Sequence, residues 1–250
     1  MKKILFSVWN DLTEPHPSVP EQKLEAFDKY KSQLVERHKQ YAYQCNADYE
    51  IFSSDTGSYV DTQFFKISQC EHLCEEYDKA VYLDMDVIPK TDKNIFDEFE
   101  FGAYFLSVEP NQWLQSNIRK NKVDAMDMYS KLCCKNAMLL LDGINGNNLI
   151  ANTGVLVYTK DASVNFSERF ESIQSIFEEA KEDNLYPSEI SSSWQINNEV
   201  FYSYIIEKNS ISYDNIGLQW NFILDDIVTE YSAAAHMIHQ VNKDFKVGLQ

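Results

Sequence analysis

Residues 79–89 read KAVYLDMDVIP, and this stretch predicts both the fold class and the place where a ligand would bind. Its first half is apolar and rich in β-branched and aromatic residues, as in a buried strand. Asp84 and Asp86 follow with a single residue between them. Two carboxylates inside a strand would lose their hydration and repel each other. We therefore expect both at the carboxyl end of a central strand, where open α/β sheets bind their ligands.

A pair of neighbouring carboxylates is stabilised by a cation lying between them. Oxygen ligands select a hard divalent ion, so Asp84 and Asp86 predict a site for Mn²⁺ or Mg²⁺. The alternative is a turn at the end of the strand in which the two acids are merely solvated. This short motif alone leaves both interpretations open.

The composition predicts one well-packed domain, since 44% of the 250 residues are hydrophobic. The formal net charge is −17. Such an acidic chain is not expected to bind nucleic acid or an anionic membrane surface through general electrostatics. A phosphorylated ligand would need a metal ion that reverses the local field. Most of the acidity is better explained as a solubility feature.

The apolar stretches are too short for a membrane span or a secretory signal. Near the amino terminus, six uncharged residues (4–9) follow Lys3 before Asn10 and Asp11. The five cysteines are an odd number without the spacing of a disulfide framework or a zinc site. We therefore expect reduced thiols, no integral membrane segment and a cytoplasmic location.

The amino-terminal part of the chain alternates strands and helices. Periodicity predicts strands over residues 2–9 and 48–53 and helices over residues 21–44 and 63–77. The second helix leads directly into the strand that carries the two acids. This alternation predicts an α/β domain with right-handed crossovers and a mostly parallel central sheet flanked by helices.

The pattern is less regular after Pro89. Residues 110–148 form a partly helical excursion of mixed polarity, which is either a lid or partner-recognition region or a surface insertion without a chemical role. Gly154 falls within a predicted strand, where glycine marks a bulge or a close backbone approach. The remaining predicted strands cover residues 101–108, 149–158 and 233–239, and the remaining predicted helices cover residues 165–184 and 195–207.

Basic and imidazole side chains also fall at predicted strand and helix ends. His239 ends the last strand and is predicted as a third metal ligand, whereas His236 would point the other way on strand alternation. Lys66, Lys243 and Lys246 are candidates for contact with a pyrophosphate. Each lysine taken alone is better explained as surface charge.

Amides and a third carboxylate complete the candidate site. Asn152 and Asn198 are amides of the kind that bind sugar hydroxyls, and Glu199 is a carboxylate suited to act at a reacting carbon. The alternative for Glu199 is a first-turn acid that the helix dipole stabilises.

The order of these motifs resembles that of metal-dependent glycosyltransferases with the GT-A fold, nearest to the glycogenin and bacterial galactosyltransferase group. After the helix that contains Lys66 come YDKAVYLDMDVIP, NTGVLVY, NNEVF, QWNF and a late HxxN followed by lysine. The resemblance spans residues 2–246 in matching order and is far more specific than the acidic motif alone.

The resemblance implies a single GT-A (Rossmann-like) domain over residues 1–250. Within it, residues 1–109 would form the nucleotide-binding half and residues 149–250 the sugar and acceptor half. Residues 110–148 would be an acceptor-recognition or lid excursion between the two.

The resemblance also implies the roles of individual residues. Asp84, Asp86 and His239 would hold Mn²⁺ or Mg²⁺ against a diphosphate, and Asp86 would thereby share in catalysis. Asn198 and Glu199 align with an Asp-Gln pair that borders the reacting sugar, so they are the other implied catalytic residues. The implied donor-binding residues are Ser7, Val8, Trp9, Asn10, Lys66, Asp84, Met85, Asn152, Thr153, Gly154, Lys243 and Lys246.

The implied reaction transfers a hexose, with retention of configuration, from a nucleoside diphosphate sugar to a hydroxyl of a carbohydrate or other acceptor. We expect a UDP-sugar ahead of a GDP-sugar. Two departures from the family pattern are Glu199, where glutamine is usual, and Asn242, where glycine is usual.

Two alternatives to a transferase are a sugar-nucleotide nucleotidyltransferase and a catalytically silent nucleotide-sugar-binding protein. The former usually holds its triphosphate with a Gly-rich, basic loop after the first strand. Residues 10–20 contain neither glycine nor lysine, which argues against it. The silent protein would bind a donor without hydrolysis or transfer.

Overall fold

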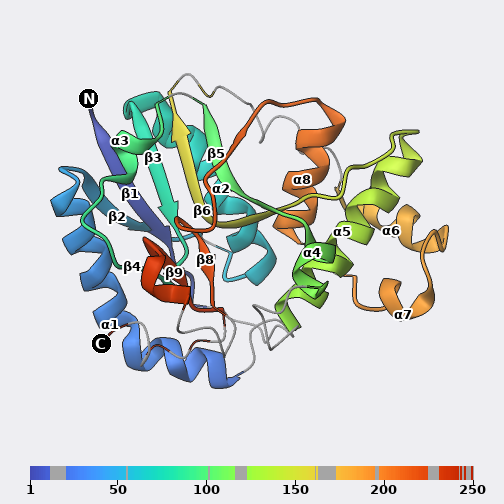
Figure 1. Cartoon of the computed structure of the whole chain (residues 1–250), viewed down its shortest axis with the longest axis horizontal. Coiled ribbons are helices and arrows are strands. Elements are labelled where there is room, and N and C mark those ends of the chain that lie inside the picture. The colour runs from blue at the N-terminus through green and yellow to red at the C-terminus, as the bar shows by residue number, and fades with distance from the viewer. Residues whose placement is uncertain are drawn as a thin grey trace.

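The computed structural model describes residues 1–11, 21–54, 56–100, 102–115, 123–160, 162, 173–194, 197–224, 231–241, 243, 245 and 249. The strands of the main sheet are β1 (Lys3–Val8), β2 (Asp48–Phe52), β3 (Lys79–Leu83), β5 (Ala103–Val108), β6 (Ile150–Thr159) and β7 (Asp214–Asn215). They pair in the order β2-β1-β3-β6-β5-β7, with β3 near the centre (Figure 1).

The sheet is mostly parallel, as the sequence predicts. β1 pairs parallel with β2 and β3, and β5 pairs parallel with β7. β6 lies between β3 and β5 and is antiparallel to both. Of the strands described in this sheet, β6 alone therefore runs against the others. A mixed α/β domain with a central sheet is confirmed.

Helices cover both faces of the sheet. They are α1 (Glu21–Gln44), α2 (Tyr59–Glu76), α3 (Ile95–Glu98), α4 (Pro110–Gln115), α5 (Val123–Leu141), α6 (Ile173–Glu182), α7 (Ser188–Ser191) and α8 (Asn198–Lys208). α1 and α5–α7 lie at opposite sides of the view in Figure 1, and α8 lies between α5 and the sheet.

Both faces of the central strands are apolar because both are covered. Phe6 and Tyr82 belong to the hydrophobic cluster that includes α2, α5 and α8. Leu5 and Val81, one residue earlier in each strand, belong to the cluster that includes α1. Successive side chains of a strand point to opposite faces, so a strand buried on both sides is a continuous apolar run.

A second, three-stranded sheet brings the end of the chain to the two acids. Its strands are β4 (Val87–Pro89), β9 (Met237–His239) and β8 (Phe222–Ile223), in the order β4-β9-β8. β4 and β9 are antiparallel, with Val87 opposite His239. This register places His239 beside Asp86, the residue that precedes β4.

The prediction of one strand over residues 233–239 is wrong in its first half. Tyr231–Ala234 forms a 3₁₀ helix (η2), and the strand begins at Met237. Three consecutive alanines, 233–235, have low β propensity because they offer little side chain to pack on a pleated surface.

Several other boundaries differ from the prediction. α2 begins at Tyr59, four residues early, because Ser58 caps it by accepting from the Asp61 amide. β6 is continuous, but its register against β5 shifts between Phe105 and Leu106, opposite the segment that contains Gly154, where the sequence predicts a bulge or a close backbone approach. The parts of the two late helices predicted over residues 165–172 and 195–196 lie outside the described residues.

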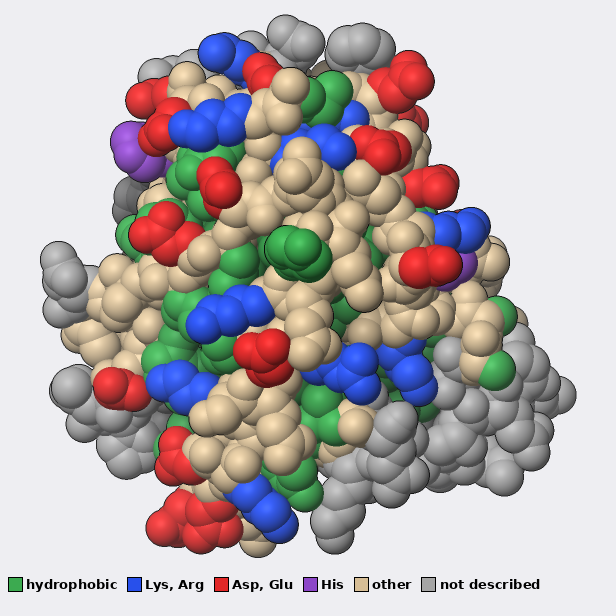
Figure 2. All heavy atoms as spheres, turned by 90° about the vertical axis from the view of Figure 1, so that its left-hand side faces the viewer, with side chains coloured by type: hydrophobic (Ala, Val, Ile, Leu, Met, Phe, Trp, Pro, Cys, Tyr) green, Lys and Arg blue, Asp and Glu red, His purple; other side chains and the backbone are tan. Residues whose placement is uncertain are grey.

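On the face of the molecule that Figure 2 shows, the charged side chains of the described residues are interspersed. Viewed from the left-hand side of Figure 1, basic and acidic side chains lie among one another rather than in separate regions (Figure 2). None of the described helices combines the length and the apolar character that a membrane crossing requires.

His38 of α1 is buried against the main sheet as a neutral imidazole. Its Nε2–H donates to the Val87 carbonyl at 2.6 Å, and its Nδ1 lies 3.0 Å from the Ser7 hydroxyl. Burial lowers the pKa of His38 to about 4, and the bond to Val87 offsets only part of this effect.

Because the pKa of His38 is lowered in the folded state, we expect the free energy of unfolding to fall as the pH is lowered from about 6.5 to about 4. In that window the unfolded chain binds a proton at His38 that the folded chain does not bind. The expected loss is on the order of 3 kcal/mol by pH 4. Urea unfolding at pH 7 and at low pH measures it. His38→Gln keeps an amide donor for Val87, so equal pH dependence in that variant and the wild type would contradict the prediction.

Candidate active site

A cleft of about 510 Å³ opens where β1 and β3 end. Its walls come from both halves of the chain: from the ends of these two strands, from β6, from α8 and from β9. The predicted site residues that line it are Val8, Trp9, Asn10, Lys66, Asp84, Met85, Asp86, Asn152, Thr153, Asn198, Glu199, His239 and Lys243. The carboxyl edge of the parallel strands is thus the concave edge of the molecule, as expected for an α/β fold.

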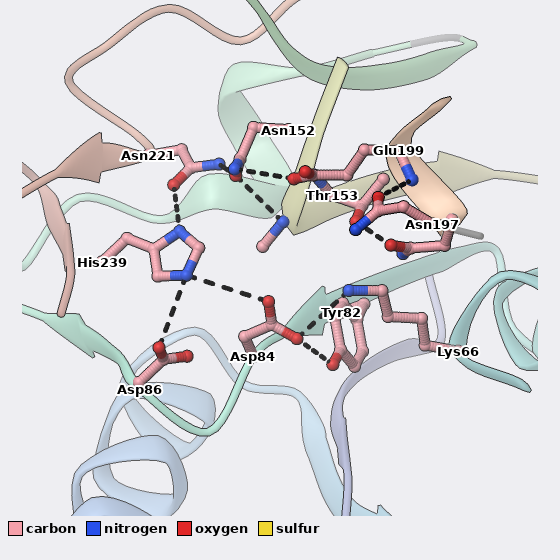
Figure 3. A network of polar contacts seen from close by, with 12 residues as sticks. Lys66, Tyr82, Asp84, Asp86, Asn152, Thr153, Asn197, Glu199, Asn221 and His239 are labelled. Atoms are coloured by element: carbon pink, nitrogen blue, oxygen red, sulfur yellow. Dashed lines mark hydrogen bonds and ion pairs between the residues drawn. The ribbon is translucent and has the colours of Figure 1, made fainter. Parts of the chain in front are cut away.

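Asp84, Asp86 and His239 converge at one point of the cleft. One ligand atom of each lies within 4.8 Å of the other two. His239 Nε2 is 3.5 Å from Asp86 Oδ2 and 3.9 Å from Asp84 Oδ2 (Figure 3). Two carboxylates and an imidazole are a donor set that fits a hard divalent cation such as Mn²⁺ or Mg²⁺. The residues present therefore fit the ion that the sequence predicts.

Basic side chains offset the charge of the two acids. Lys66 Nζ donates to Asp84 Oδ1 at 3.2 Å, and the Tyr82 hydroxyl donates to the same oxygen. Lys243 donates to Asp86. Burial on its own would raise the pKa of Asp86, but Lys243 holds it well below its usual range. Asp86 is therefore an ionised carboxylate throughout the physiological pH range.

A second polar cluster forms around the carboxylate of Glu199. Oε1 accepts from Asn152 Nδ2 at 2.8 Å and from the Thr153 amide at 3.2 Å. Oε2 pairs with Lys131 Nζ at 2.6 Å. Asn198 Nδ2 donates to the Thr153 hydroxyl at 2.8 Å. This carboxylate is thus hydrogen-bonded on both oxygens at the wall of the cleft.

The alternative interpretation of Glu199, as a first-turn acid, also describes its place in the fold. Asn197 is the N-cap of α8, and its side chain accepts from the Glu199 amide at 2.8 Å. The side chain of Glu199 nevertheless turns into the cleft, where it is 9% exposed. Glu199 thus belongs to the first turn of α8 and also lines the cleft.

Two predicted residues do not line the cleft. Ser7 is fully buried, and its hydroxyl contacts His38 instead. Gly154 has no side chain, but it lies against the ring of His239. Lys246 lies outside the described residues, so the sequence-based choice between it and Lys243 stays open. The binding roles of these residues stay predictions.

Sequence reasoning did not identify two residues that matter to the site. Lys131, on α5, pairs with Glu199 across 68 positions of sequence and reads in isolation as a surface lysine of an amphipathic helix. Asn221 Oδ1 accepts from His239 Nδ1 at 3.1 Å, and the only sequence signal for Asn221 was its place in the QWNF motif.

Gly154 is required where β6 passes His239. A Cβ built at this position would lie 2.3 Å from His239 Cε1 and 2.5 Å from Nδ1, closer than any ordinary contact. The strand backbone therefore forms the support on which the imidazole ring rests.

We expect Gly154→Ala to displace His239 and to weaken Mn²⁺ binding at least ~10-fold, since misplaced ligands lose affinity. Overpacking should also cost about 1 to 3 kcal/mol of unfolding free energy. Mn²⁺ titration and urea unfolding measure the two effects. In a His239→Ala background the added methyl has room, so the same glycine replacement should cost little stability there. An equal cost in both backgrounds would show that the clash is not with His239.

The overall structure is similar to that of solved glycosyltransferases. It aligns with a glycosyltransferase involved in the glycosylation of the major capsid of PBCV-1, with 13% identity, 99% of each chain covered and a TM-score of 0.52. Mouse xyloside xylosyltransferase 1 aligns with 11% identity over 96% of this chain and 97% of its own, with a TM-score of 0.42. Galactosyltransferase LgtC, solved with donor and acceptor sugar analogues, aligns with 12% identity over 95% and 86%, with a TM-score of 0.43.

The first of these likenesses shows a shared glycosyltransferase fold. The sequence places the chain more narrowly, because residues 12–239 match the model of glycosyl transferase family 8. Since this match spans most of the chain, the protein belongs to glycosyl transferase family 8 and is a glycosyltransferase enzyme. None of the curated proteins matches it in sequence.

Proposed function

We propose that this enzyme transfers a hexose from a nucleoside diphosphate sugar to an acceptor hydroxyl, with the help of a divalent metal ion. The observation that carries the proposal is the convergence of Asp84, Asp86 and His239 within 4.8 Å in a chain of this family. Mn²⁺ or Mg²⁺ bound there would stabilise the charge that develops on the leaving diphosphate.

The lysines beside the acids would bind the phosphates. Lys243 pairs with Asp86, and a metal ion bound to that carboxylate would compete with this pairing. The released ammonium would then lie within reach of an anionic donor. Lys66, 2% exposed and held by Asp84, is a fixed positive charge at the other side of the acids. Both lysines thus add to the field that favours a leaving diphosphate.

The second cluster would hold the transferred sugar. Asn152, Asn198 and Thr153 present amide and hydroxyl groups to the cleft, and these groups bind sugar hydroxyls. Both oxygens of Glu199 are engaged by donors, with Lys131 on one of them. A carboxylate held in this way is suited to stabilise positive charge at the anomeric carbon. We propose that transfer proceeds with retention of configuration and that Glu199 lies beneath the reacting carbon.

The end of β1 would bind the nucleoside. Val8, Trp9 and Asn10 line the cleft at the end of this strand. Trp9 offers an aromatic surface to a base, and the amide of Asn10 is a polar neighbour held by the Ser54 backbone. We propose a UDP-sugar ahead of a GDP-sugar, and a carbohydrate or another hydroxyl compound as acceptor.

A thermal-shift panel of nucleoside diphosphate sugars, with Mn²⁺ or with chelator, tests the proposal. A donor present at ~100 times its Kd should stabilise the folded state by about 2.7 kcal/mol. We expect one donor to do so only with metal, and to release its nucleoside diphosphate when acceptors are added. Stabilisation that survives chelation would refute the metal site. Binding without release of the diphosphate would support a catalytically silent protein instead.

A further inference from the structure

A continuous chain of hydrogen bonds joins the two polar clusters of the cleft. It runs from Glu199 to Asn152, then to Asn221, and ends at the imidazole of His239 (Figure 3). Asn221 is fully buried, and Asn152 and His239 are 6% and 5% exposed. Buried amides in such a chain have a single arrangement that satisfies every donor and acceptor.

The direction of the chain is fixed at Asn152. Glu199, as a carboxylate, only accepts, so Asn152 must turn its Nδ2 toward it, at 2.8 Å. The backbone amide of Gly154 only donates, and it lies 3.1 Å from Asn152 Oδ1. Two neighbours of opposite kind therefore assign the two ends of this amide without ambiguity.

The orientation of the Asn152 amide also determines the orientation of the Asn221 amide. Asn221 Nδ2 lies 2.7 Å from Asn152 Oδ1, where only a donor fits. Asn221 must then present its Oδ1 to His239 Nδ1, at 3.1 Å. An amide oxygen only accepts, so Nδ1 of the imidazole carries a proton.

We propose that Asn221 is a positioning residue that fixes the tautomer of His239, with the proton on Nδ1 and the lone pair of Nε2 facing Asp84 and Asp86. The proposal rests on the proposed function, because the Nε2 lone pair acts as a ligand only if Asp84, Asp86 and His239 bind the same cation. Gly154 supports the plane of the ring, and Asn221 decides which nitrogen of that ring is the ligand.

The opposite tautomer would be unable to bind a cation. Its Nε2–H would point at Asp84 and Asp86, where it would donate to a carboxylate and leave no lone pair for the ion. Replacing a residue that orients a ligating histidine in this way typically lowers the metal affinity 10–100-fold. Asn221 is therefore expected to set the affinity of the cation site without touching the ion.

The direct test is the tautomer itself. Long-range ¹H–¹⁵N NMR of the metal-free protein at alkaline pH, where imidazoles are neutral, reports which nitrogen of each of the five histidines is protonated. His239→Gln assigns the resonance. We expect Nδ1–H in the wild type and in Asn221→Asp, which keeps an oxygen acceptor for His239 although it loses the donor to Asn152 Oδ1. In Asn221→Leu, of similar size but without an acceptor, we expect Nε2–H or a mixture.

Mn²⁺ affinity, measured by electron paramagnetic resonance without donor, gives the second readout. Asn221→Leu should weaken it ~10–100-fold, and Asn221→Asp should recover most of the loss. The control is Asn145→Leu, at an exposed position. If the leucine variant does not fold, Asn221→Ala provides the same comparison.

An unchanged tautomer and an unchanged affinity in the leucine or alanine variant would overturn the proposal. Failure of the wild type to bind Mn²⁺ would instead refute the metal site of the proposed function. The NMR result would still decide the role of Asn221 in that case, so the two failures are distinguishable.

Discussion

Replacing Asp86 with asparagine is expected to abolish metal-dependent transfer while leaving the protein folded. Asp86 is 4% exposed and supplies a carboxylate oxygen that faces His239 Nε2 at 3.5 Å. An amide of the same shape keeps the packing but loses the charge that would hold the cation. Metal ions contribute several kcal/mol to such reactions, so we expect a loss of ~10³-fold or more in kcat/KM.

The fold should survive because asparagine removes the buried charge of Asp86 but keeps the packing contacts of its side chain. The partner left behind, Lys243, has a side chain that is 15% exposed and can turn to solvent. Thermal unfolding and circular dichroism check the fold, and Mn²⁺ titration checks the site. The matched control is Asp92→Asn, at an exposed position a few residues further along the chain. Full activity in the Asp86 variant would rule out this metal site.

The second large effect is expected at Lys131, the residue of α5 that pairs with Glu199. Burial by itself would lower the pKa of Lys131, but the carboxylates of Glu199 and Asp127 raise it, so the lysine is charged. Lys131→Met would leave the carboxylate of Glu199, 9% exposed, without its cation. Removing one partner of a buried pair costs about 3 to 5 kcal/mol. The cleft admits water, so we expect the lower end of that range.

A double replacement separates this pair from simple loss of packing. In Lys131→Met with Glu199→Gln no unpaired charge is left, and most of the lost stability should return even though activity should not. At this chain length ~3 kcal/mol corresponds to a fall in Tm of roughly 6 to 12 °C. Lys39→Met, on the exposed face of α1, is the control for the loss of a lysine. A double variant as unstable as the single one would show that Lys131 contributes through packing alone.

The expected transfer defect of these variants differs in kind. Asp86→Asn removes a metal ligand, so its activity should no longer respond to Mn²⁺ concentration. Lys131→Met leaves the metal ligands in place, so its Mn²⁺ affinity should be close to that of the wild type. This difference tests whether the cleft contains two functional clusters or one.

Most of the fold was predictable because the pattern of apolar residues within a single helix or strand indicates the type of that element and which of its faces is buried. The apolar run of residues 79–83 and the helical periodicity of residues 21–44 each report the burial of one element. The predicted helix over Glu21–Gln44 is confirmed to the residue. The strand predicted over residues 233–239 is wrong in its first half, because burial of an alanine-rich segment says little about whether it is extended or helical.

The sequence by itself determined that two acids end a central strand and that a late histidine follows them. Strand alternation and charge repulsion allow few other arrangements of such residues. Only the tertiary structure decided that Val87 lies opposite His239, that Lys131 pairs with Glu199, and that Asn221 directs the imidazole. These contacts depend on how separate helices and strands pack, and hydrogen bonds form or fail over fractions of an ångström. No spacing along one chain encodes distances of that kind between segments so far apart in sequence.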